Sequence, residues 1–126
     1  MTGKELGIAV AKEVMGWNQY SSDRRWVYPL FSVSSDGLMV ADSEESTLAR
    51  LWTPWCDMND AVEVLRMIAQ AKFSIRERFI KALEEVLPLA EDGKDVIAFT
   101  WWWFFYADQP RYILRAALEA VRGEQT

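Results

Sequence analysis

The sequence predicts an α+β fold. We expect an α/β/α sandwich in which about four helices cover a sheet of about three mainly antiparallel strands, in the order α-β-β-α-α-β-α. The first observation is residues 96–106, Val-Ile-Ala-Phe-Thr-Trp-Trp-Trp-Phe-Phe-Tyr. Side chains alternate across a strand, so a strand here would be aromatic on both faces and would need cover on both. The second is that most other apolar residues recur at the spacing of amphipathic helices.

A first helix is expected over about residues 3–15. Thr2 and Glu5 form a capping box, which satisfies backbone N–H groups at the helix start. Gly16 can adopt the left-handed conformation that ends a helix, and Trp17 is placed to pack back on it. The residues between these ends include an apolar stripe of Leu6, Val10 and Val14.

Two short strands are expected next, over residues 25–32 and 37–41. The sequence Ser-Ser-Asp-Gly at residues 34–37 is typical of a hairpin turn. Pro29 cannot donate a ladder hydrogen bond, so the first strand is expected at a sheet edge or at a bulge. Residues 42–56 are interpreted as a long connection.

Two further helices are expected over residues 58–70 and 75–87. Asp57 is the expected cap of the first, and its apolar positions follow a 3.6-residue period. Ser74 and Glu77 form a second capping box before the other helix.

The aromatic segment over residues 96–106 is expected to be the third strand. The last helix then begins with Pro110 at its first position and closes at Gly123. The chain contains no internal repeat and no low-complexity linker, so residues 1–126 are interpreted as a single domain.

The composition restricts the chemistry. The chain has no histidine, which is the commonest metal ligand and the usual acid or base at neutral pH. We therefore expect no enzyme activity, no cofactor and no metal. The net charge of −5 disfavours direct nucleic-acid binding. A single cysteine, no secretory pattern and no apolar run long enough for a bilayer favour a cytoplasmic protein without a membrane segment.

Three segments resemble a known family, the phage ABA sandwich domain family of small phage and prophage proteins. They are the opening Met-Thr-Gly-Lys-Glu-Leu with Val-Ala-Lys-Glu-Val-Met-Gly-Trp, residues 52–64, and residues 110–118. The resemblance implies an α/β/α sandwich and a bacteriophage or prophage origin. It implies no catalytic residues. Cys56 stands where the resemblance leads us to expect serine or threonine.

The first candidate binding residues are Arg24 and Arg25, with Trp26 and Trp17 nearby in sequence. Paired guanidinium groups beside aromatic rings suit a phosphate or a nucleotide, through bidentate hydrogen bonds and stacking. The alternative is a solvent-exposed turn in which the arginines cover a neighbouring tryptophan.

Tryptophans supply the other candidates. Trp52 and Trp55 precede a predicted helix N-terminus and either anchor a partner or close the end of the core. Trp101 and Trp103 either belong to the core or form a partner or self-association surface.

Two kinds of site are considered and set aside. Cys56 as a nucleophile is disfavoured because no histidine can activate it and an acidic residue, Asp57, is adjacent. A cation site formed by Asp57 and Asp60, with Asp42, Glu44 and Glu45 upstream, is disfavoured because the first two carboxylates are better explained as helix caps.

The expected function is that of a non-enzymatic phage or prophage accessory protein. It would bind and inhibit a host protein in the bacterial cytoplasm, in antagonism of host defence. The alternative is a sponge that sequesters a nucleotide second messenger, with Arg24 and Arg25 for the phosphates and Trp17, Trp26, Trp52 or Trp55 for the base. Because the aromatic residues exceed what a small domain normally hides, an isologous homodimer is also expected.

Overall fold

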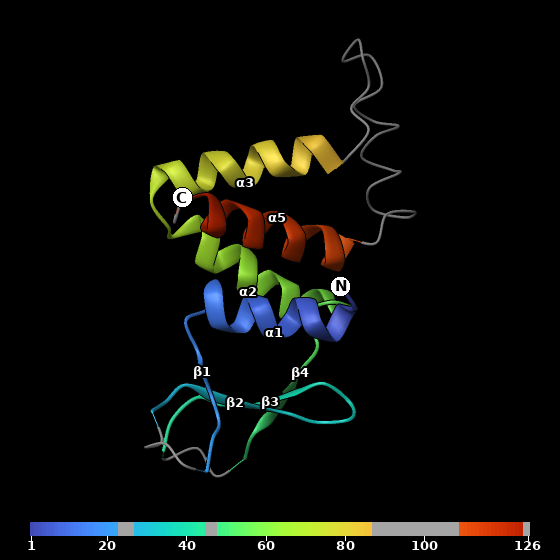
Figure 1. Cartoon of the computed structure of the whole chain (residues 1–126), viewed down its shortest axis with the longest axis vertical. Helices are drawn as coiled ribbons and strands as arrows, with labels where there is room; N and C mark the ends of the chain where they lie inside the picture. Colours follow the sequence, from blue (N-terminus) through green and yellow to red (C-terminus); the bar gives the residue numbers. More distant parts are fainter. Residues whose placement is uncertain (23–26, 45–47, 87–108, 125–126) are drawn as a thin grey trace.

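A computed structural model describes residues 1–22, 27–44, 48–86 and 109–124 of the chain (Figure 1). Its elements are α1 (Gly3–Glu13), β1 (Asn18–Gln19), β2 (Leu30–Val33), β3 (Leu38–Ala41), β4 (Arg50–Trp52), α2 (Met58–Ala69), α3 (Phe73–Val86) and α5 (Gln109–Glu124). Within these residues there are four helices and one four-stranded sheet. The α+β class and the number of helices are therefore confirmed.

The sheet differs from the predicted three mainly antiparallel strands. Its order is β1-β2-β3-β4, and it is mixed because β1 runs parallel to β2 while the other pairs are antiparallel. β1 has two polar residues and β4 lies in the expected connection, so neither shows the alternation that predicts a strand. β2 begins at Leu30, directly after Pro29, rather than at residue 25. The predicted strand over residues 96–106 lies outside the described residues.

The helix ends follow their predicted caps in α1 and α2. Thr2 Oγ1 accepts a hydrogen bond from the backbone N–H of Glu5 at 3.1 Å, and Gly16 adopts a φ of 71° beyond the C-terminus of α1. The Asp57 carboxylate accepts from the backbone N–H of Asn59 at 2.9 Å at the start of α2. Local side-chain chemistry thus sets these boundaries.

The capping box predicted at Ser74 and Glu77 is wrong. The carbonyl of Lys72 already accepts hydrogen bonds from the N–H groups of Ile75 and Arg76, at 3.0 and 3.1 Å. Ser74 therefore lies inside α3, which begins at Phe73.

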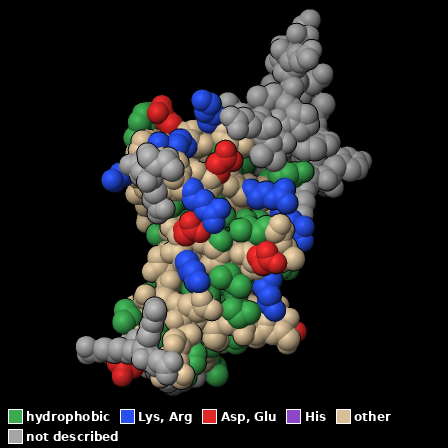
Figure 2. Space-filling view, viewed as in Figure 1, with side chains coloured by type: hydrophobic (Ala, Val, Ile, Leu, Met, Phe, Trp, Pro, Cys, Tyr) green, Lys and Arg blue, Asp and Glu red, His purple; other side chains and the backbone are tan. Residues whose placement is uncertain are grey.

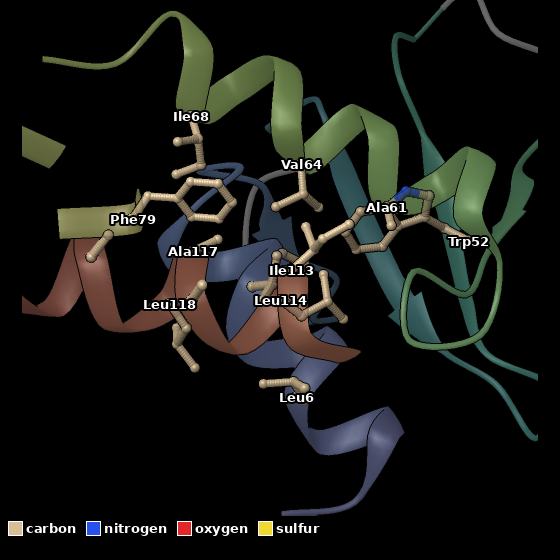
Figure 3. Close-up of a cluster of buried hydrophobic side chains, with 14 of the residues drawn as sticks. Leu6, Trp52, Ala61, Val64, Ile68, Phe79, Ile113, Leu114, Ala117 and Leu118 are labelled. Atoms are coloured by element: carbon tan, nitrogen blue, oxygen red, sulfur yellow. The ribbon is translucent and has the colours of Figure 1, made fainter. Parts of the chain in front are cut away.

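α5 lies between α3 and the other two described helices (Figure 1). It contacts α1, α2 and α3, and its buried alanines allow these helices to approach closely. Figure 3 shows the α5 residues Ile113, Leu114 and Ala117 among core side chains from the other helices and from β4. The helical core is therefore built around one helix.

The sheet turns one face towards the helices. Phe31, Leu38, Val40 and Trp52 have no exposed surface, and the register places Phe31 opposite Val40 and Leu38 opposite Trp52. These four side chains therefore share one face. In Figure 1 the described helices all lie on that side of the sheet. The described part thus has helices on one face, whereas the α/β/α prediction placed them on both.

Trp55 packs against α1 at two glycines four residues apart. A Cβ atom on Gly3 would lie 2.6 Å from Trp55 Cδ1, and one on Gly7 would lie 2.5 Å from Trp55 Cε3. Residues i and i+4 share a face of a helix, so the two missing side chains make room for the indole ring. Trp55 therefore helps to close the core, in agreement with one of its two interpretations.

Replacing Gly7 with alanine should destabilise the protein. Alanine in place of glycine gains about 1 kcal/mol in an open helix position. Here the new Cβ overlaps the indole ring, and overpacking costs about 1–3 kcal/mol. We expect a net decrease in the free energy of unfolding, measured by urea denaturation. In a Trp55→Ala background the same change should stabilise, and equal destabilisation in both backgrounds would contradict this contact.

Candidate binding site

Three of the predicted binding residues, Trp17, Trp52 and Trp55, lie in the described part of the chain. The remaining ones lie outside the described residues, and their roles stay predictions: Arg24, Arg25, Trp26, Trp101 and Trp103.

The structure brings Trp17 and Trp52 together. Their ring centroids are 4.6 Å apart and the planes meet at 62°, an edge-to-face arrangement that is favourable for aromatic pairs. Trp52 has no exposed surface, and its Nε1 has no hydrogen-bond partner among the described residues. A fully buried ring cannot stack on a ligand, so Trp52 contributes to the core.

Arg50 connects the sheet to α2. Its two terminal nitrogens donate to the two carboxylate oxygens of Glu63 at 2.6 and 3.0 Å. Asp42 accepts from Nε at 3.1 Å and from Nη2 at 3.3 Å. The guanidinium carbon lies 5.7 Å from the ring centroid of Trp17, within cation–π range.

These contacts give the Arg50 side chain a structural role. The hydrogen bonds to Glu63, and then those to Asp42, hold the pKa of Arg50 above its ordinary value. Because both carboxylates bind the guanidinium through two oxygens, it is not available to a phosphate. The Trp17–Trp52–Arg50 cluster is therefore a structural element and not a nucleotide pocket.

Sequence reasoning did not single out Arg50 or Glu63, and it considered Asp42 only as a cation ligand. Hydrophobic periodicity could not have predicted these contacts. Arg50 lies on a short strand, whereas Asp42 follows the neighbouring strand and Glu63 lies in the middle of a helix. Within the residues that the structure describes, no group of three or more cysteine and acidic side chains could hold a metal ion.

The segment before α2 is held by hydrogen bonds at the helix start. The Asp60 carboxylate accepts from the backbone N–H of Thr53 at 2.8 Å. Burial raises the pKa of Asp60 above its ordinary value, and the hydrogen bond from Thr53 opposes that shift. Cys56 is exposed, with Sγ 3.7 Å from the Thr53 carbonyl oxygen. Asp57 therefore caps the helix as predicted, whereas Asp60 binds the backbone of the segment before the helix.

The face of the sheet that points away from the helices is largely apolar on β2, β3 and β4, while β1 places Asn18 beside Leu30. Alternation along the paired strands places Leu30, Ser32, Met39, Ala41 and Leu51 on it. Tyr20 extends it, since its N–H bonds the Phe31 carbonyl at 2.7 Å just beyond β1. We call these six residues the outer sheet face.

The outer sheet face is exposed to solvent at its two edges, at Leu51 and at Tyr20. Leu51 is 49% exposed and Tyr20 is 44% exposed, while the residues between them are half-buried. Val27 and Leu48, which precede β2 and β4, are also exposed. Single exposed apolar residues are ordinary, but a row across neighbouring strands is typical of a binding surface. Of the described surfaces, this one is the best candidate site.

No protein-family model, curated protein or solved structure matches this chain. The resemblance to the phage ABA sandwich domain family therefore depends on the three segments quoted above. None of the described helices is long and apolar enough to cross a membrane.

Replacing Arg50 with methionine should lower the free energy of unfolding by about 1–3 kcal/mol. The change leaves the carboxylates of Asp42 and Glu63 close together without their cation. Both partners of the closer ion pair are partly exposed, at 36% and 29%, so the loss stays below that of a fully buried pair. Chemical denaturation measures it. Arg66→Met, on the exposed surface of α2, is the control, and an equal loss there would contradict the role of Arg50.

Replacing Asp60 with asparagine should change the pH dependence of stability. The pKa of Asp60 is raised above 3.8 in the folded protein, so stability falls as pH rises between the unfolded and folded pKa values. Asparagine keeps an acceptor for the Thr53 N–H and does not titrate. The stability of the variant relative to the wild type should therefore increase from acidic to neutral pH. A decrease over that interval, in thermal unfolding at several pH values, would contradict the raised pKa.

Proposed function

We propose that this chain is a non-enzymatic binding protein that attaches to a host protein through the outer sheet face and blocks it. The resemblance to phage proteins supports a bacteriophage or prophage origin, action in the bacterial cytoplasm, and antagonism of host defence. The observation that carries the proposal is the apolar outer sheet face, which the described helices leave open.

The chemistry of the chain supports a binding role over catalysis. It has no histidine, and several of its described carboxylates cap a helix, as Asp57 does, or hold an arginine, as Glu63 and Glu13 do. Aromatic and aliphatic side chains such as Tyr20, Met39 and Leu51 are the kinds of residue that occupy the centres of protein interfaces. A flat surface of three short strands suits a protein partner better than a small molecule, which needs a concave site.

The same proposal bears on the second layer of the predicted α/β/α sandwich. In the described part of the chain the sheet has helices on one face. Its other face carries apolar residues that gain stability when they are removed from water. We propose that the second layer of the sandwich is completed over the outer sheet face when the partner binds.

The nucleotide sponge is the weaker proposal. The guanidinium that lies over the ring of Trp17 is that of Arg50, and it is held by two carboxylates. Trp52, one of the rings expected to stack on a base, is fully buried. The remaining support is the sequence pair Arg24 and Arg25.

Replacing Leu51 with glutamate should abolish capture of the host partner. The change places a charge on the proposed interface, on the edge strand β4, at a side chain that is 49% exposed, so the fold should tolerate it. We expect about a tenfold or greater loss of recovered partner in a pull-down from bacterial lysate. Circular dichroism verifies that the bait is folded.

The matched control is Ile80→Glu, the same kind of change on α3 at a side chain that is 57% exposed. It should recover the same partner as the wild type. Undiminished recovery by Leu51→Glu, or equal loss in both variants, would overturn the outer sheet face as the binding surface.

A further inference from the structure

A second surface lies between α1 and α5, away from the outer sheet face. It is a groove of about 430 Å³ lined by Met1, Leu6, Arg115, Leu118, Glu119, Arg122 and Gly123. On the face shown in Figure 2, hydrophobic side chains lie between basic and acidic ones over these two helices. The groove thus combines an apolar floor with a charged rim.

Arg122, on this rim, already forms an ion pair within the chain. Its Nε and Nη2 donate to the two carboxylate oxygens of Glu13 at 3.0 and 2.9 Å, which ties α5 to α1. The pKa of Glu13 is lowered, chiefly by these hydrogen bonds.

Arg115 and Glu119 differ from Arg122 in this respect. Both are exposed, and the side chain of neither makes a hydrogen bond or an ion pair with any part of the chain that the structure describes. They lie four residues apart on one face of α5, about 6 Å along its axis. An acidic residue before a basic one is the better order for a pair within a helix, and here the order is reversed. The rim therefore presents one unpaired cation and one unpaired anion side by side.

Such a pair of charges is complementary to itself. If a second α5 lies antiparallel to the first, a two-fold axis midway between the two positions places Arg115 of each copy against Glu119 of the other. A two-fold interface requires this kind of self-complementary patch. Met1 is 68% exposed beside the same groove, so its side chain would also be covered.

We propose that the α1/α5 groove is the contact surface for a second copy of this chain, in an isologous dimer with antiparallel α5 helices. Each dimer contains two Arg115–Glu119 ion pairs between copies. Exposed ion pairs contribute little, so the dimer forms at high protein concentration and weakens with salt. The proposal shares no residue with the outer sheet face and stands independently of the host-binding function.

Analytical ultracentrifugation of the full chain, from micromolar to millimolar concentration, tests the proposal. The wild type should change from the 14.6 kDa monomer to a dimer as concentration rises. Arg115→Glu and Glu119→Arg should each weaken dimerisation about tenfold, because each places like charges in contact. Arg66→Glu, an exposed charge reversal on α2, should leave it unchanged.

The most discriminating measurement uses an equimolar mixture of Arg115→Glu and Glu119→Arg. Arg115→Glu presents two anions and Glu119→Arg presents two cations, so a mixed dimer regains both ion pairs although each variant alone is repelled. The mixture should dimerise at least as tightly as the wild type. A wild type that stays monomeric at every concentration, or a mixture no tighter than its components, would overturn the proposal. Retained host capture by Arg115→Glu would show that such a failure leaves the proposed function intact.

Discussion

The interaction that connects the sheet to α2 is that of the Arg50 guanidinium with two carboxylates. It joins the end of β3, through Asp42, and the middle of α2, through Glu63, to the edge strand β4. It also covers the ring of Trp17, which packs edge-on against the buried Trp52. A sheet of short strands gains little stability from strand pairing alone. The Arg50 ion pairs, beside the buried indole ring of Trp52, therefore help to fix the position of the sheet on the helices.

The Arg50 interactions lie on the face of the sheet that packs on the helices, and the opposite face is left free of them. Arg50 and Trp52 belong to the face that packs on the helices, so Leu51 between them must point the other way. Of the tryptophans that suggested a binding site, the described ones pack in or against the core, and Trp55 fits the space left by two glycines of α1. On the described sheet, the side chains left for recognition are mainly aliphatic ones and a tyrosine on the opposite face.

The parts of the fold that could be predicted from sequence are those set by local chemistry. Thr2 and Gly16 mark the ends of α1 as expected. β1 and β4 could not be predicted, because strands of two and three residues have no measurable alternation. The site residue Arg50 was missed because its partners are distant in sequence. One signal was available: Gly3 and Gly7, at helical spacing, indicate the close approach of a large side chain.

Photo-crosslinking in a bacterial host tests the central claim most directly, since it reports contact without mutating the interface to a charge. A photoreactive residue in place of Leu51 should form a covalent adduct with one host protein. The same residue in place of Ile80, which is similarly exposed on α3, should form none. Adducts from position 80 alone, or no adduct from position 51 while the host protein still co-purifies, would contradict a function carried by the outer sheet face.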